Sequence, residues 1–245
     1  MEINNETKIL VGVLLATIII IVIGAVLSGG TGDQGQVATE PIANTDRLLA
    51  AESHFTGPAD APVTVIEFGD FECPACGALH PILQHVKENN SEVKFVYRHF
   101  PLTSIHPRAR PAALAAEAAA AQGKFFEYHD QLYENQSQLG DQDFITHAEA
   151  IGLDVAAFEQ ALADGVGEDA VQQDVSDSAA LGLRSTPTLF VNGVQYTGQY
   201  SVNGLQAAID AAHEATPHEH TEESEHEEEH GDNDHADEDE QAHEE

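Results

Sequence analysis

The sequence predicts an α/β domain in which a strand-helix-strand unit and a later strand-strand-helix unit flank a block of helices. The first unit begins with the apolar run 63–68, which has the composition of a buried strand. A helix from about 73 to 89 follows this run, and a second strand is expected at 93–99. These three segments form the strand-helix-strand unit.

Helical patterns then dominate from about residue 105 to residue 182, where short Gly, Asp and Gln breaks separate the helical pieces. Two short apolar runs, 188–191 and 194–197, flank the pair Asn192-Gly193, which is a strong hairpin signal. A last helix from 201 to about 212 closes the domain. The expected fold class is therefore α/β with an inserted helical block.

The only two cysteines of the chain lie together in Cys73-Pro74-Ala75-Cys76. A disulfide across two intervening residues constrains the unfolded chain little, so this pair suits thiol exchange better than structural bracing. At the start of a helix, Cys73 would be stabilised as a thiolate by unpaired backbone N–H groups and the helix dipole, which makes it the nucleophile. Cys76, about one turn further on, is the natural resolving thiol.

Two other interpretations of the cysteine pair stay open at this point. A structural zinc site needs four ligands, and the chain has no second cysteine pair to complete one. Two inert buried thiols are also possible, although a buried strand leading into a turn and a helix is the setting that a redox motif predicts.

An uncharged apolar segment, 9–27, precedes the domain. As a helix rising about 1.5 Å per residue it would span roughly 28 Å, close to a bilayer's hydrocarbon core, so we predict a transmembrane signal anchor. The alternative is a cleaved signal peptide, whose apolar region is usually about 7–15 residues. Lys8 favours a cytoplasmic location for residues 1–8, and residues 28–53 are expected to form a flexible linker. The domain would then lie in the extracytoplasmic compartment, where disulfides persist.

The segment 213–245 consists mainly of Glu, Asp and His and contains seven of the 14 histidines of the chain. With so few apolar residues it is expected to be disordered. A weak metal buffer, in which His226 and His230 could share a face, is the alternative to a simple solvated tail. The net charge of -34 argues against nucleic acid as a partner. No metal ligand and no cofactor is predicted for the domain itself.

Five ordered stretches of the domain resemble the DsbA-like thiol:disulfide oxidoreductases: 61–68, 70–77, 97–102, 123–130 and 186–193. The resemblance implies a thioredoxin fold over 54–212 with a helical insertion at about 105–182. It also implies Cys73 as the nucleophile, a reversible disulfide from Cys73 to Cys76, and Pro187 as a cis-proline beside them. The implied activity is disulfide transfer to proteins that fold outside the cytoplasm.

A cis bond before Pro187 would present the backbone of Thr186 toward the cysteine pair, where an extended substrate could add as a strand. Thr186 is therefore a candidate substrate-binding residue, together with Pro74 and Ala75 between the cysteines.

Glu67 is a fourth candidate catalytic residue. It lies in the central apolar strand, where a carboxylate is costly unless it is paired or protonated. A buried ionisable group six residues before the nucleophile is a candidate proton shuttle. The alternative is an edge position, with the carboxylate in water or paired with Arg98.

Ala75 departs from the family pattern, because strongly oxidising members have a histidine there that stabilises the thiolate. Glu72, next to Cys73, also disfavours the thiolate. We therefore predict a Cys73 pKa below the free value of about 8.5 without reaching the lowest known values, and a less oxidising potential. His54 and His99, like His106, are expected to be packing or surface residues.

The leading hypothesis is a membrane-anchored oxidase that gives its disulfide to secreted or surface proteins. The resemblance implies a quinone-linked membrane reoxidant of the DsbB or vitamin K epoxide reductase type. One alternative is a reductase or isomerase that works in the opposite direction. The other is a metal-binding protein that acts through its histidine-rich tail.

Overall fold

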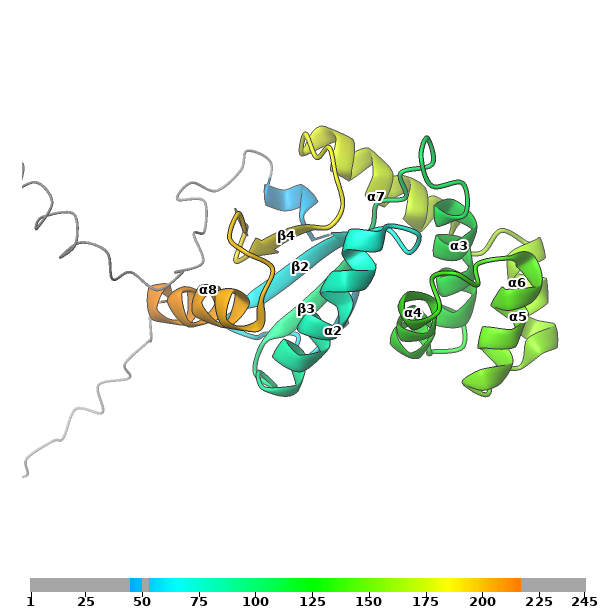
Figure 1. Cartoon of the computed structure of the whole chain (residues 1–245), viewed down its shortest axis with the longest axis horizontal. Coiled ribbons are helices and arrows are strands. Elements are labelled where there is room, and N and C mark those ends of the chain that lie inside the picture. Colours follow the sequence, from blue (N-terminus) through cyan, green and yellow to red (C-terminus); the bar gives the residue numbers. More distant parts are fainter. Residues whose placement is uncertain (1–44, 50–52, 217–245) are drawn as a thin grey trace, which may run out of the picture.

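Two apolar segments pair in parallel at the centre of a five-stranded sheet in the computed structural model, which describes residues 45–49 and 53–216 (Figure 1). They are β2 (Thr64–Gly69) and β3 (Lys94–His99), joined by α2 (Pro74–Glu88). β4 (Thr188–Val191) pairs antiparallel with the other side of β2. This arrangement confirms the predicted strand-helix-strand unit and places β2 in the middle of the sheet.

Short strands complete both edges, in the order β1-β3-β2-β4-β5. β5 (Val194–Gln195) follows β4 through Asn192 and Gly193, both of which have positive φ, as a tight hairpin turn requires. β1 (His54–Thr56) pairs antiparallel with β3 and was not expected. Three residues are too few to show a strand period in the sequence.

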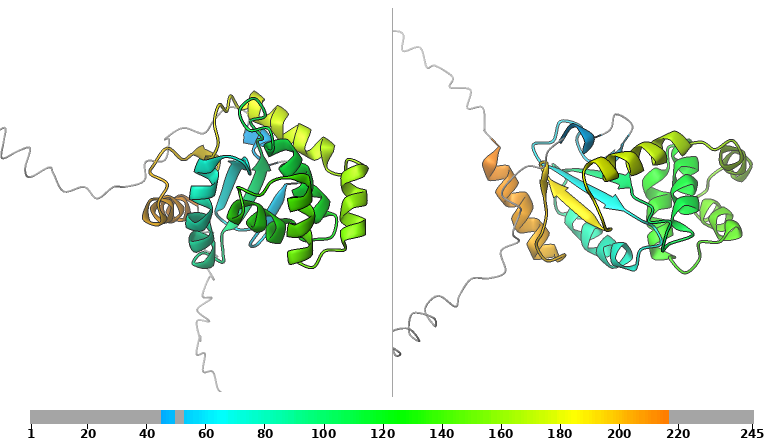
Figure 2. Two further views of the ribbon diagram at one scale, coloured as in Figure 1. Left: turned by 45° about the vertical axis from the view of Figure 1, so that its right-hand side comes forward. Right: turned by 90° about the horizontal axis from the view of Figure 1, so that it is seen from above.

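The inserted helices lie between β3 and β4 and pack at one end of the sheet (Figure 1). Seven alanines of the first of them are buried, and these small side chains let its helical neighbours pack closely. The last of them, drawn in yellow-green, returns along the sheet (Figure 2). In chain order they are α3 (Ala109–Ala120), α4 (Phe125–Glu134), α5 (Asp141–Ala150), α6 (Val155–Ala163) and α7 (Glu168–Ala180).

The alternation of side chains along β2 divides the core of the sheet into two faces. Val65 packs in a cluster with side chains of α2 and of α8 (Val202–Ala215). Ile66 and Phe68 point the other way, into a cluster that includes Leu48. Glu67 follows the same alternation as Val65, so its carboxylate lies on the α2 face.

A third core joins the helical insertion to the redox-active end of the sheet. Both cysteines belong to it, together with Phe71 and Tyr97 and with aromatic side chains of α4. The cysteine pair is therefore packed against the insertion as well as against its own helix.

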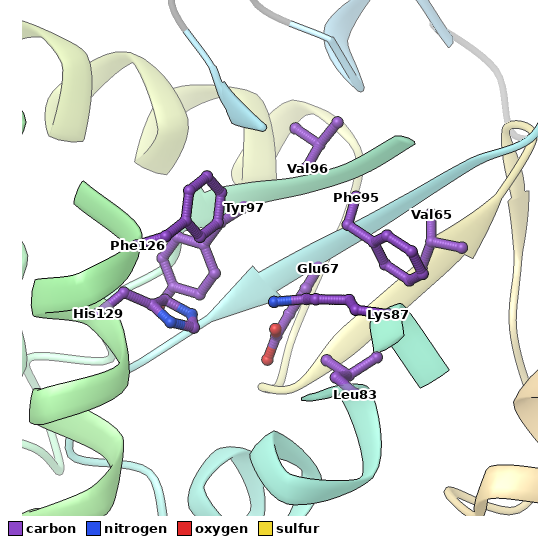
Figure 3. Close-up of a pocket in the computed structure, with 9 residues that line it drawn as sticks. All are labelled: Val65, Glu67, Leu83, Lys87, Phe95, Val96, Tyr97, Phe126 and His129. Atoms are coloured by element: carbon purple, nitrogen blue, oxygen red, sulfur yellow. The ribbon is translucent and has the colours of Figure 1, made fainter. Parts of the chain in front are cut away.

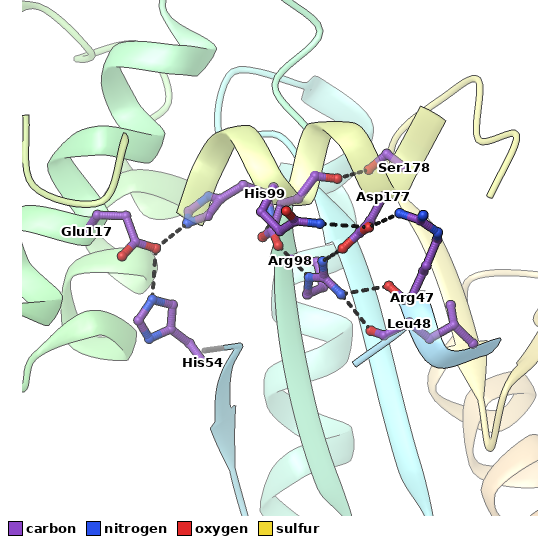
Figure 4. Close-up of polar contacts among 10 residues, drawn as sticks. Arg47, Leu48, His54, Arg98, His99, Glu117, Asp177 and Ser178 are labelled. Carbon is purple, nitrogen blue, oxygen red and sulfur yellow. Dashed lines mark hydrogen bonds and ion pairs between the residues drawn. The ribbon is translucent and has the colours of Figure 1, made fainter. Parts of the chain in front are cut away.

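Arg98 forms a buried hub on the face of the sheet opposite α2 (Figure 4). Its side chain is fully buried and donates to Asp174 at 2.6 Å and to Asp177 at 2.8 Å, both on α7. It also donates to the backbone carbonyls of Arg47 and Leu48 at 2.9 Å. The hub thus ties β3 to α7 and to the segment that precedes the domain.

That hub corrects one predicted boundary. The linker expected over 28–53 includes a short 3-10 helix, Thr45–Arg47, and the buried side chain of Leu48. The backbone there is held by Arg98, a long-range contact that composition could not indicate.

The tail boundary is also later than expected. The disordered segment was predicted to begin at residue 213, but α8 continues to Ala215. His213 lies 3.7 Å from Glu92, and the hydroxyl of Thr216 donates to the carbonyl of Ala212 at 2.9 Å. These contacts extend the helix by about one turn.

The predicted anchor at 9–27 and nearly all of the acidic tail lie outside the described residues. Within 45–49 and 53–216, no helix has the length and apolar character needed to cross a bilayer.

Candidate active site

The cysteine pair lies where β2 ends and α2 begins. Cys73 is the N-cap residue, with φ -72° and ψ 120°, and Pro74 follows at the first helical position, where its missing N–H costs nothing. Both cysteines are free thiols in this structure. Cys73 is 6% exposed and Cys76 is fully buried, so only Cys73 reaches the surface.

The surroundings of the two thiols shift their pKa values in opposite directions. A hydrogen bond from Cys76 is the main cause that lowers the pKa of Cys73 to about 5, despite partial burial. Thr186 and the backbone N–H groups of Ala75 and Cys76 lower it further. Burial raises the pKa of Cys76 well above its usual value. The predicted lowering of the Cys73 pKa agrees in direction with this environment.

Pro187 lies beside the nucleophile. The Thr186-Pro187 bond is cis, as the resemblance implies, and the Cys73 thiol donates to the Thr186 carbonyl at 3.4 Å. The hydroxyl of Tyr200 holds the loop by donating to the Pro187 carbonyl at 3.0 Å. The Thr186 hydroxyl is buried and has no partner among the described residues, so it is free to donate to a Cys73 thiolate.

Glu67 lies beneath the cysteine pair, between Tyr97 of β3 and Leu189 of β4. Its side chain is 7% exposed, and burial raises its pKa to about 7, against the opposing effect of Lys87. The edge position and the pairing with Arg98 are therefore wrong. Its Oε1 has no hydrogen-bond partner within the described ranges.

A small cavity lies beside Glu67 (Figure 3). It measures about 10 Å³, which is room for one water molecule, and Lys87 and His129 share its walls with Glu67. Figure 3 shows the amino group of Lys87 and the ring of His129 turned toward the Glu67 carboxylate. A water here could exchange protons with the carboxylate.

Lys87 is a residue of this site that the sequence analysis missed. It lies on the last turn of α2, three turns beyond the cysteines, and its side chain reaches back to the sheet. Helical spacing from Leu83 places it on the inward face, and this was the one signal available.

A second group that the sequence analysis missed holds the turn just before α2, residues 70–73, which we call the redox turn. The buried Asp70 carboxylate accepts from the backbone N–H of Glu72 at 2.8 Å, from that of Leu102 at 2.9 Å, and from His106 at 2.8 Å. Burial alone would lower the pKa of His106, but its bond to Asp70 raises it, with a smaller contribution from Cys73. The interaction with Asp70 thus favours the protonated form of His106.

The helical insertion also holds the redox turn. Gln136, just after α4, donates to the carbonyls of Phe71 at 2.8 Å and Cys73 at 2.9 Å. A Cβ at Gly77 would lie 2.0 Å from the Gln136 carboxamide oxygen, so glycine is required for this approach.

The other predicted residues lie at the rim or away from the site. Pro74 and Ala75 are exposed on the first turn of α2, where a substrate segment can reach them. His54 and His99 both bond to one oxygen of Glu117 at 2.8 Å (Figure 4). They join the sheet to α3 and are packing residues, as expected.

Comparison with known proteins supports this site. A family model described as Thioredoxin matches residues 50–211. A thioredoxin-like oxidoreductase from Silicibacter pomeroyi is similar in structure, with 28% identity, a TM-score of 0.64, and coverage of 71% of this chain and 99% of that one. The thiol-disulfide exchange protein alpha-DsbA2 from Wolbachia pipientis has the same fold at 21% identity and a TM-score of 0.62, covering 68% and 90%.

The curated relatives are longer proteins. The chain is 42% identical over 163 residues to the Na(+)/H(+) antiporter NhaA 1 of Salinispora arenicola, covering 66% of this chain and 25% of that protein. It is 44% identical over 159 residues to NhaA 3 of Salinispora tropica, covering 65% and 24%. The chain thus spans about a quarter of the length of these relatives.

The family match covers most of the described domain and includes both cysteines and the cis-proline. The insertion lies between β3 and β4, and the thiols of the pair differ in acidity as nucleophile and resolving thiol should. The chain therefore belongs to the thioredoxin family.

Proposed function

We propose that the protein is a membrane-anchored oxidase that gives the Cys73–Cys76 disulfide to thiols of secreted or surface proteins. The observation that carries this direction is the stabilised Cys73 thiolate. Because a thiolate is present only in the reduced pair, every bond that lowers the Cys73 pKa favours reduction of the pair and oxidation of its substrate.

The reaction balances in two exchanges. A substrate thiolate attacks Sγ of Cys73, the bond between the cysteines breaks, and Cys76 leaves as a thiolate that takes a proton. A second substrate thiolate then attacks the substrate sulfur of the mixed disulfide and releases the Cys73 thiolate. The substrate loses two electrons and the cysteine pair gains them.

Glu67 supplies the proton that Cys76 takes. A pKa of about 7 leaves both its forms populated near neutral pH, which suits a group that gives and recovers protons. The Lys87 ammonium and a water in the adjacent cavity would restore its proton from solvent.

The sequence supports a proposed location and proposed partners. The apolar segment 9–27 would anchor the chain with the domain in the extracytoplasmic compartment. Reduced extracytoplasmic proteins are then the substrates, and a quinone-linked membrane protein of the DsbB or vitamin K epoxide reductase type reoxidises the pair. An Na(+)/H(+) antiporter acts across a membrane, so the longer relatives support a membrane location.

We expect the thiolate absorbance of the reduced full-length chain to titrate near pH 5, because the bonds to the thiolate outweigh its burial. Below that pH Cys73 becomes a thiol, so its attack on disulfides slows. Equilibration with glutathione buffers should give a potential between about -120 and about -270 mV.

Two results would contradict the oxidase. A thiolate midpoint at or above the free value of about 8.5 would remove its physical basis. A potential near about -270 mV, the thioredoxin value, would instead favour the reductase.

Replacing Glu67 with glutamine should slow the protonation of Cys76 and its reverse by about a hundredfold near neutral pH. The amide keeps the shape of the side chain but cannot transfer a proton. The rate of mixed-disulfide resolution, followed by stopped flow, should lose its inflection near pH 7, while the Cys73 titration near pH 5 remains.

Glu88→Gln is the matched control, because this carboxylate lies exposed at the end of α2. It should leave the pH profile unchanged. An inflection near pH 7 that persists in Glu67→Gln would exclude Glu67 as the proton donor.

A further inference from the structure

Three metal-ligating side chains meet between α2 and α4, outside the redox pair. His80 Nε2 lies 3.7 Å from Asp130 Oδ1, and His129 Nδ1 lies 2.9 Å from the same oxygen. The three ligand atoms all lie within 4.8 Å of one another. Ligand atoms around a tetrahedral zinc ion, with bonds of about 2.0–2.1 Å, are about 3.3 Å apart, so this spacing needs little adjustment.

The three groups are held in the forms that bind metal. Burial lowers the pKa of His80, and it lowers that of His129 to about 3, so both imidazoles are neutral at pH 7. Burial alone would raise the pKa of Asp130, but its hydrogen bond and charge interaction with His129, together with Gln84 and His80, lower it, so the carboxylate is charged. The neutral ring of His129 donates its Nδ1 proton to Asp130, so binding an ion through Nδ1 needs this proton to move to Nε2, and the imidazole as a whole loses none.

An access route leads to the cluster from the surface. A groove of about 520 Å³ runs between α2 and the end of α4, and His80 lies on its wall together with Gly77, Gln84 and Tyr133. The Asp130 carboxylate is half-buried. A fourth coordination position can thus remain open to water.

The outer surroundings also fit an ion. A histidine that binds metal through one nitrogen usually offers its other N–H to a carboxylate or a water. The ring of His129 lines the small cavity that it shares with Glu67, whose Oε1 has no partner within the described part of the chain. A water in that cavity could accept from His129 Nε2 and donate to Glu67.

The local charges do not exclude a cation. Lys87 faces His129 and opposes a bound cation, whereas Asp130 and Glu67 favour one. The nearest titratable groups thus include one amine and two carboxyl groups.

The second group with suitable spacing, His54, His99 and Glu117, is a weaker candidate. Its carboxylate oxygen already accepts a hydrogen bond from each of the two imidazoles at 2.8 Å, whereas the Asp130 oxygen accepts one from a ring at that range. Nδ1 of His99 is buried and has no partner in the described ranges, so it lacks the outer hydrogen bond that a metal-binding histidine needs.

We propose that His80 Nε2, His129 Nδ1 and Asp130 Oδ1 form a site for a divalent transition-metal ion of the zinc class, with a fourth position open to the groove. The site joins α2 of the sheet domain to α4 of the insertion. It does not depend on the proposed oxidase, because none of its ligands takes part in thiol exchange.

Zinc titration of the full-length chain by calorimetry tests the site, with Cys73 and Cys76 replaced by serine in every variant so that thiolates bind no metal. We expect His80→Gln/His129→Gln to bind one zinc equivalent fewer than its parent, or to bind that equivalent at least about tenfold more weakly. Asp130→Asn, a half-buried change that preserves shape, should weaken the same equivalent.

His85→Gln is the matched control, because this exposed histidine lies on α2 and lines the same groove. This variant should bind the same number of zinc equivalents as its parent. Zinc should also raise the thermal unfolding midpoint of the parent but not of Asp130→Asn, since an ion in the proposed site joins α2 to α4. Equal stoichiometry and affinity in parent, double variant and Asp130→Asn would overturn the proposal, as would an equal zinc-dependent midpoint shift in parent and Asp130→Asn.

Discussion

Replacing Cys73 with serine is expected to reduce disulfide exchange at least about a thousandfold, because the nucleophile and its stabilised thiolate are both lost. Replacing Cys76 has a different consequence. Cys76→Ser keeps the nucleophile Cys73 but has no thiol to resolve the first exchange, so a mixed disulfide between Cys73 and substrate accumulates. Mass spectrometry of the full-length chain, after reaction with a disulfide-containing peptide, distinguishes the two variants.

The physical reason for this asymmetry lies in the start of α2. Cys73 is the N-cap residue and reaches the surface, whereas Cys76 is fully buried and its pKa is raised. The outcome that would contradict these roles is specific: a trapped peptide on Cys76 in Cys73→Ser, with none on Cys73 in Cys76→Ser.

Replacing Arg98 with leucine should destabilise the domain by about 3–5 kcal/mol, the largest stability effect expected of a single substitution here. The guanidinium is fully buried and donates to two carboxylates and two backbone carbonyls. Leucine leaves Asp174 and Asp177 buried without their principal cation. Equilibrium urea unfolding of the full-length chain, followed by circular dichroism, measures the change.

Arg110→Leu provides the control for this measurement. Arg110 pairs with the exposed Glu168, so its loss should cost less than about 1 kcal/mol. Similar destabilisation by the two variants would mean that the buried hub contributes no more than a surface ion pair.

Much of the fold could be predicted because its signals are local. The apolar run before Cys73, the Asn192-Gly193 turn and the helical periods each occupy a few consecutive residues. β1 lacked such a signal, because it has three residues and is held by pairing with β3. The segment around Leu48 was missed for the same reason, since its contacts come from Arg98.

The residues of the candidate site also divide into those with a local sequence signal and those without one. Cys73, Cys76 and Pro187 belong to motifs that the sequence displays directly, and Glu67 was found because a charge interrupts an apolar strand. Lys87 and Gln136 could not be found so easily. Their roles depend on side-chain direction and on contacts between distant segments, such as the bonds from Gln136 to the redox turn.

The bonds from Gln136 bear on how the protein could be shortened. The inserted helices interrupt the chain between β3 and β4, so they look like a module that could be cut out to leave a minimal exchange domain. Such an excision would remove Gln136, and it would also remove the insertion side chains from the core that covers both cysteines. Residues of the sheet domain and of the insertion thus form the redox centre together. A shortened catalyst would need new side chains to cover the two cysteines.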